Sequence, residues 1–95
     1  MSRVKELLEY NGYSEELIDE IVVFENYSYA TAFIGVTEDN RAVYDFNKMI
    51  EFLLNTGDFK TETEAIEWIE CNTIRSLGYV DNAPIIVNIL EDYNE

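Results

Sequence analysis

The stretch EAIEWIECNTIRSLGY, residues 64–79, is the most informative part of this sequence for a chemical site. It contains the only cysteine, Cys71, which would be a nucleophile in its thiolate form. It also contains Glu64, Glu67 and Glu70, and pairs of carboxylates can act as general acid and general base. These side chains either form a catalytic site or belong to an amphipathic helix.

The absence of histidine from the sequence decides against catalysis. The usual base at neutral pH is missing, and Cys71 cannot form a cysteine–histidine pair. Neighbouring carboxylates disfavour a thiolate, so we predict that Cys71 is an inert packing residue. The three glutamates recur every three residues, which is typical of the solvated face of a helix. We therefore predict that the protein is not an enzyme and has no catalytic residues.

Metal and cofactor sites are not indicated either. One cysteine and no histidine cannot supply the nitrogen and sulfur ligands of a zinc site. Glu38, Asp39 and Asp45 lie near the turn in TEDNRAVYD, but the spacing lacks the alternation and central glycine of an EF-hand. No glycine-rich phosphate loop occurs. We expect no metal and no cofactor, with a weak surface site for calcium or magnesium as the alternative.

The net charge of the chain is −14, from 20 acidic and 6 basic residues. A surface this negative repels phosphate backbones and anionic lipids, so we expect no direct binding to nucleic acid and none to membranes. It favours a protein partner with a basic surface, which electrostatic steering would bring to it. The alternative is that the charge serves solubility only.

Seven tyrosines are many for a chain of 95 residues, and tyrosine is enriched in protein interfaces. Two of them flank Ser28 in ENYSYATAF, close to an expected sheet edge. The predicted partner-binding surface combines these two tyrosines with exposed carboxylates and consists of Tyr27, Tyr29, Glu38, Asp39, Glu64, Glu67 and Glu70. The alternative is that the tyrosines line the boundary of the core.

The elements that would position these side chains follow from periodicity and capping signals. Helices are expected at about 3–10, from Ser14 onward, over 46–56, and from Thr61 to Gly78, which would be its left-handed C-terminal residue. Residues 29–44 read as a β-hairpin, and IIVNIL, residues 85–90, as a last strand. Gly35 inside the hairpin indicates a bulge or close packing.

The order α-α-β-β-α-α-β predicts a single α+β domain over residues 1–95, with helices packed on a small, mainly antiparallel sheet. In the fourth helix, Ala65, Ile69 and Thr73 share the core side, whereas Trp68 and Cys71 fall on the opposite side. We expect another element to cover that side. Apolar runs are only about four residues long and no secretory signal is evident, so a cytoplasmic location is expected.

Two stretches, GVTEDNRAVYDFNKMIEFLL and EAIEWIECNTIRSLGYVDNAPIIV, resemble a group of short, acidic, uncharacterised proteins of Gram-positive gut bacteria and their phages or mobile elements. The resemblance covers residues 35–87, and its most specific part is the pattern E-A-I-E-W-I-x-x-N-T-I-R. It implies a bacterial or phage context and an intracellular location. It implies no activity, because none is assigned to the group.

These observations predict a non-enzymatic interaction protein whose acidic surface binds a basic protein surface as a mimic of nucleic acid. A phage- or mobile-element-encoded inhibitor, for instance of anti-CRISPR type, fits this description. The alternative is a small homo-oligomeric structural or assembly protein, such as a homodimer formed through strand or helix faces.

Overall fold

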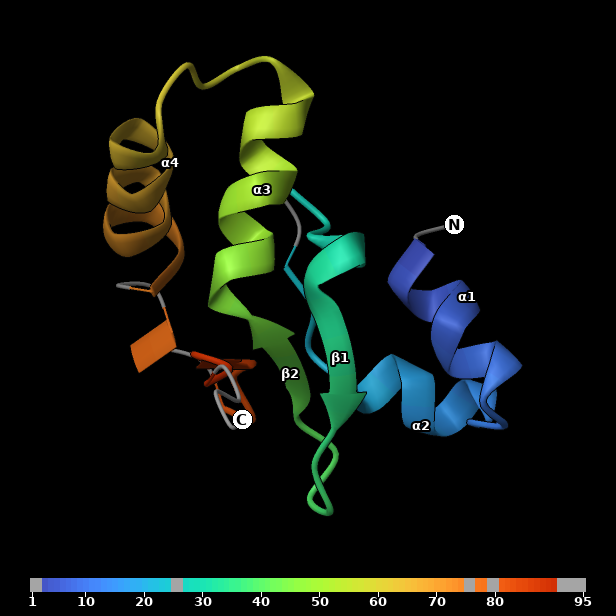
Figure 1. Ribbon diagram of the computed structural model, residues 1–95. Helices are drawn as coiled ribbons and strands as arrows, with labels where there is room; N and C mark the ends of the chain where they lie inside the picture. The colour runs from blue at the N-terminus through green and yellow to red at the C-terminus, as the bar shows by residue number, and fades with distance from the viewer. Residues whose placement is uncertain (1–2, 25–26, 75–76, 79–80, 91–95) are drawn as a thin grey trace, which may run out of the picture.

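A three-stranded sheet in the order β1-β2-β3 lies at the centre of the fold (Figure 1). The strands are β1 (Phe33–Val36), β2 (Ala42–Asp45) and β3 (Ile85–Val87). β1 and β2 are antiparallel, whereas β2 and β3 are parallel. The sheet is thus mixed rather than mainly antiparallel, because two helices carry the chain from the end of β2 back to the end of the sheet where β2 begins.

The computed structural model describes residues 3–24, 27–74, 77–78 and 81–90. Its α-helices are α1 (Arg3–Tyr10), α2 (Glu15–Glu20), α3 (Phe46–Thr56) and α4 (Glu62–Trp68). α3 and α4 stand side by side, whereas α1 and α2 lie together on the other side of β1 (Figure 1). The predicted α-α-β-β-α-α-β order and the α+β class are confirmed.

Capping residues fix where three of the helices begin. The side chain of Ser14 accepts a hydrogen bond from the backbone N–H of Leu17, and Asp45 Oδ1 accepts from two backbone N–H groups of α3. Thr61 Oγ1 accepts from the backbone N–H of Glu64 at 3.2 Å. Each cap satisfies helix N–H groups that have no partner inside the helix. The predicted starts after these three residues are therefore confirmed.

The end of the fourth helix differs from the prediction. After Trp68 the winding widens into a π-helical segment, η2 (Ile69–Ile74). Gly78 does not have the left-handed backbone expected of a C-terminal cap. Gly57, by contrast, ends α3 with a φ of 85°, as predicted. The prediction for Gly78 was wrong because the helix leaves regular α-geometry nine positions earlier, where each turn takes up more residues.

The hairpin is shorter than the predicted range of 29–44. Tyr29 has a left-handed backbone with φ 51°, and Ala30–Ala32 form a 3₁₀ turn, η1, before β1 begins. The pairing register then shifts between Phe33 and Gly35, which confirms the expected bulge. Ile34 is 44% exposed whereas Ala32 is buried, because the bulge interrupts the alternation of the strand.

Aromatic rings fill the space between β2, α3 and the segment that precedes β1. Phe24, Tyr29, Phe33 and Tyr44 form one cluster, with ring centroids 4.8–6.4 Å apart. Tyr44 is fully buried, and its hydroxyl has no hydrogen bond of good geometry to any described residue. Burial raises the pKa of Tyr44 to about 12, although an interaction with the backbone of Phe24 opposes part of the rise. Among the described residues, the core therefore contains a hydroxyl whose only interaction, with the backbone of Phe24, is a weak one.

Candidate partner-binding surface

A shallow hollow on α4 brings carboxylates and aromatic rings together at the surface. Its volume is about 470 Å³, and its lining is Asp58, Phe59, Glu64, Glu67, Trp68, Cys71 and Asn72. We call it the α4 hollow. It contains Glu64 and Glu67, two of the residues predicted to bind a partner. Asp58 and Phe59 were missed, since they lie in the loop before α4, where helical spacing gives no signal.

Glu64 has a structural role as well as a place in the α4 hollow. Its Oε1 accepts a hydrogen bond from the backbone N–H of Lys60 at 2.9 Å. Thr61 accepts in turn from the backbone N–H of Glu64, which makes a reciprocal cap at the start of α4. In the common form of this cap the glutamate would reach the backbone N–H of Thr61 itself. The carboxylate of Glu64 is thereby held in place at the rim of the α4 hollow.

Trp68 is half-buried, and two rings from other segments cover part of it. The indole lies 5.9 Å from the ring of Tyr27 and 5.8 Å from the ring of Phe59, measured between centroids. Tyr27 also lies edge-on to Phe52 of α3, at 6.5 Å. The expected cover over this side of α4 is present only in part. The segment before η1 and the α3–α4 loop cover one side of Trp68, whereas Cys71 is exposed. The remaining surface of the indole lines the α4 hollow.

The hydroxyl of Tyr27 donates a hydrogen bond to Asp58 Oδ2 at 3.0 Å. This bond, followed by partial burial, raises the pKa of Tyr27 because it favours the protonated form. The side chain is half-buried and packs beneath the α4 hollow. Tyr27 therefore supports Asp58 and Trp68, which do line the hollow.

Tyr29 cannot belong to a partner-binding surface, which corrects the prediction. It is 1% exposed, and its hydroxyl lies 3.3 Å from Thr73 Oγ1 in the core. Burial is the main cause of its raised pKa. The prediction assumed an extended strand at this position. The left-handed backbone at Tyr29, followed by η1, turns the ring inward instead.

Glu38 and Asp39 are exposed at the tip of the β1–β2 hairpin. Thr37 Oγ1 donates a hydrogen bond to Asp39, and this bond is the main cause of the lowered pKa of that carboxyl. Asp39 therefore carries its charge well below neutral pH. The tip and α4 lie at opposite ends of the molecule (Figure 1). The structure thus does not join these two carboxylates to the α4 hollow.

Glu70 also lies apart from Glu64 and Glu67. It lines a different hollow, of about 360 Å³. The other lining residues belong to α3, η2 and β3 or follow shortly after η2 and β3. The residues of that hollow are Phe46, Glu70, Ile74, Leu77, Ile86 and Asn88. Three-residue spacing turns steadily around a helix, and the change to π-winding at Ile69 adds to the drift. The predicted glutamate face is therefore divided between two surfaces.

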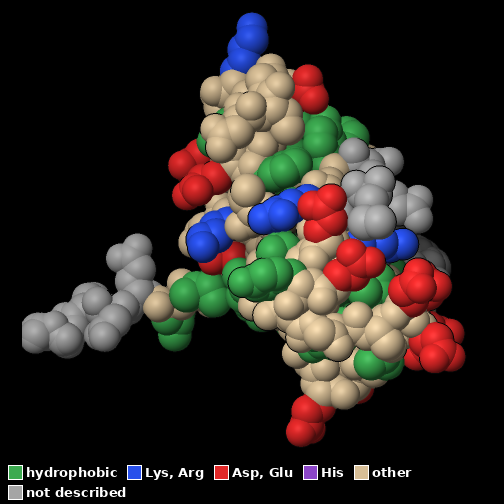
Figure 2. All heavy atoms as spheres, turned by 90° about the vertical axis from the view of Figure 1, so that its right-hand side faces the viewer, with side chains coloured by type: hydrophobic (Ala, Val, Ile, Leu, Met, Phe, Trp, Pro, Cys, Tyr) green, Lys and Arg blue, Asp and Glu red, His purple; other side chains and the backbone are tan. Residues whose placement is uncertain are grey.

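Acidic residues outside the predicted set are spread over the molecule. All four acidic residues of α2, namely Glu15, Glu16, Asp19 and Glu20, are exposed. Figure 2 shows the face that carries α1 and α2, where acidic side chains are scattered among hydrophobic ones. On α1, Arg3 lies 3.4 Å from Glu6, but an exposed ion pair of this kind contributes little stability. The acidic charge is thus not confined to the α4 hollow.

No protein-family model, curated protein or solved structure matches this chain. Within the described ranges, no group of three or more histidine, cysteine, aspartate or glutamate side chains could hold a metal ion. Over the same ranges, none of the helices has the length and apolar character needed to cross a membrane. Function must therefore be inferred from the surfaces themselves.

Proposed function

We propose that this protein is a non-enzymatic interaction protein that binds a basic surface of another protein through the α4 hollow. The observation that carries the proposal is the arrangement of Asp58, Glu64 and Glu67 around the exposed part of Trp68. An arginine or lysine side chain could place its charge among these carboxylates and over the indole ring. Its alkyl stem would pack on the apolar lining.

The distribution of charge supports a partner that normally binds nucleic acid. Proteins that bind nucleic acid present basic surfaces to phosphate groups. A chain of net charge −14, with carboxylates on α2, on the hairpin tip and on α4, is complementary to such a surface. We propose that the protein acts in the cytoplasm as a nucleic-acid mimic. A phage- or mobile-element-encoded inhibitor of a nucleic-acid enzyme, for instance of anti-CRISPR type, is the form we favour.

The test is an affinity capture from bacterial lysate at low and moderate salt, with mass-spectrometric identification. We expect capture of a basic nucleic-acid-binding protein, with the yield falling as the salt concentration rises. Glu67→Lys, in the α4 hollow, should abolish the capture. Glu51→Lys is the matched control, because it makes the same change of charge at an exposed position of α3. Equal loss in both variants would show that only the total charge matters and would contradict a role for the hollow.

A second candidate function, homo-oligomeric assembly, is favoured by the free edge of β1. Within the described residues, only β2 pairs with β1. Two copies that paired through this edge would form a continuous sheet. The mutual repulsion of two chains of net charge −14 opposes this, so a dimer should form only as salt is raised. Sedimentation velocity at low and high salt distinguishes the two functions, since heterologous capture weakens with salt and self-association strengthens.

A further inference from the structure

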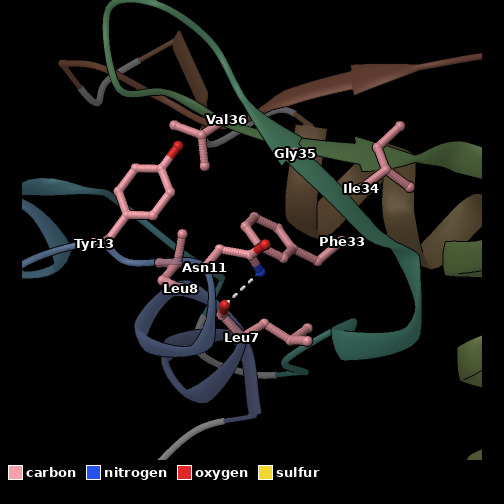
Figure 3. Close-up of a pocket in the computed structure, with 8 residues that line it drawn as sticks. All are labelled: Leu7, Leu8, Asn11, Tyr13, Phe33, Ile34, Gly35 and Val36. Carbon is pink, nitrogen blue, oxygen red and sulfur yellow. Dashed lines mark hydrogen bonds between the residues drawn. The ribbon is translucent and has the colours of Figure 1, made fainter.

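The free edge of β1 lies beside an apolar hollow between the strand and α1. Its volume is about 390 Å³, and its lining is Leu7, Leu8, Asn11, Tyr13, Phe33, Ile34, Gly35 and Val36 (Figure 3). We call it the β1 groove. The edge of a strand that lacks a neighbour presents backbone N–H and C=O groups to any extended chain that approaches it. The β1 groove therefore offers backbone pairing and an apolar pocket at one place.

Most of the residues that line the β1 groove have apolar side chains. Gly35 has no side chain, and a Cβ placed on it would meet no atom within 4 Å, so the face of the strand is open at this position. Asn11 Nδ2 donates to the backbone carbonyl of Leu7 at 2.7 Å, so the amide is engaged with α1. Phe33 points toward α1 across the groove, whereas Ile34 points away (Figure 3).

Charge at one end of β1 indicates what would bind there. Glu38 and Asp39 follow β1 within three residues and are exposed at the hairpin tip. A strand laid along β1 would pass these two carboxylates as it left the sheet. A basic side chain at that point of the incoming strand would be complementary to them.

We propose that the β1 groove binds an extended segment of a basic partner protein, which joins the sheet as a further strand beside β1. The backbone of the segment pairs with β1, and one apolar side chain enters the hollow lined by Leu7 and Tyr13. A lysine or arginine of the segment lies against Glu38 and Asp39. This inference does not depend on the α4 hollow, since no residue lines both.

A second copy of the chain is the less suitable occupant for two reasons. Each copy has a net charge of −14, so pairing would bring two chains with the same sign of charge together. β1 is also only four residues long, which allows few backbone hydrogen bonds to offset that repulsion. A short segment of opposite charge has neither disadvantage.

The test uses a short peptide of alternating lysine and valine, titrated into the ¹⁵N-labelled protein. We expect amide shifts at Phe33–Val36 and in α1. Two N-methylated peptides serve as matched controls: each has methyl groups on alternate backbone nitrogens, and the two sets are offset by one residue. Only the set that faces β1 should weaken binding, by roughly tenfold or more for two lost hydrogen bonds. A peptide of alternating glutamate and valine should not bind.

Variants of the protein locate the binding. Leu7→Ser should weaken the lysine–valine peptide roughly fivefold or more, because it removes apolar lining from the β1 groove. Leu17→Ser is its control, since Leu17 is a leucine of α2 that is 37% exposed and lies outside the groove. Three results would each overturn the proposal. These are equal effects of the two substitutions on peptide affinity, equal affinity for the two methylated peptides, and amide shifts confined to α4. So would pairing of β1 with a second copy in the absence of peptide.

Discussion

Tyr27 and Asp58 are joined by a 3.0 Å hydrogen bond although they lie 31 positions apart in the sequence. The bond connects the segment before η1 to the loop between α3 and α4. Trp68 packs against the ring of Tyr27, so the bond also holds the aromatic side of the α4 hollow. The shape of the proposed partner site thus depends on a long-range contact between two residues that both lie outside α4.

Tyr27→Phe should weaken the contact between the Tyr27 segment and the α3–α4 loop without unfolding the protein. The ring would keep its packing, but Asp58 would lose its donor, and Trp68 would become more accessible. We expect stronger quenching of tryptophan fluorescence by acrylamide, which is simple to measure because the chain has one tryptophan. Tyr10→Phe is the control, since Tyr10 is almost fully exposed on α1. Identical quenching in the two variants would contradict the supporting role of Tyr27.

Tyr44→Phe should stabilise the protein. The variant keeps the ring in its aromatic cluster and removes a buried hydroxyl that has no hydrogen bond of good geometry to any described residue. We expect the free energy of unfolding to rise by about 1 kcal/mol in urea titrations at neutral pH. A loss of stability instead would show that the hydroxyl is satisfied in solution, for instance by a water molecule.

At alkaline pH the stability of Tyr44→Phe should differ from that of the wild type in a second way. Burial raises the pKa of Tyr44 from 10.0 to about 12, so the folded state holds this proton more tightly than the unfolded state. The resulting stabilisation is fully present below pH 10 and is lost as the pH rises through about 12. Thermal melts between pH 9 and pH 12 should therefore decline less steeply for Tyr44→Phe. Equally steep declines of the melting temperature in the two proteins would contradict a raised pKa for Tyr44.

Gly57→Ala should destabilise the protein, and Gly78→Ala should have little effect. Neither position is crowded, since a Cβ at either glycine would meet no atom within 4 Å. Gly57 has a φ of 85°, where a side chain is strained, and the cost should be about 1 kcal/mol. Gly78 lacks a positive φ. Chemical denaturation of both variants tests this directly, and equal losses would show that η2 ends differently in solution.

Thr61→Ala should cost about 1 kcal/mol of unfolding free energy, because it removes the side chain that caps α4. Thr63→Ala, two positions later, is the matched control. Thr63 lies inside the first turn, where alanine is the better helix former, so stability should be unchanged or slightly higher. Urea titrations give both values. A similar loss in both would indicate that packing, rather than the cap, decides the start of α4.

The local chemistry of the chain could be predicted from the sequence. Ser14, Asp45 and Thr61 cap helices where their side chains suggested, and Gly57 ends α3 with the backbone that glycine permits. These features depend on a few neighbouring residues. The placement of Trp68 and Cys71 together, away from the core side of the fourth helix, followed from helical spacing in the same way.

Features set by distant contacts could not be predicted in this way. Tyr29 lies in a stretch that alternates like a strand, yet contacts in the core hold it in a left-handed conformation. Asp58 is held in the α4 hollow by a hydrogen bond from Tyr27, and the two residues lie far apart in the sequence. The parallel pairing of β3, by contrast, could have been predicted from the sequence. Two helices separate β3 from β2, and a connection that crosses back over the sheet usually leads to a parallel strand.

Cys71 was predicted to be an inert packing residue, but the packing role was wrong, because the side chain is exposed on the lining of the α4 hollow. Because it is the only cysteine in the sequence, a maleimide dye would attach to the native protein at this position alone. The dye would sit one helical turn from Trp68, whose emission could excite it. Arrival of a partner would then appear as a change in energy transfer, and binding at the proposed surface could be followed in real time without any substitution in the sequence.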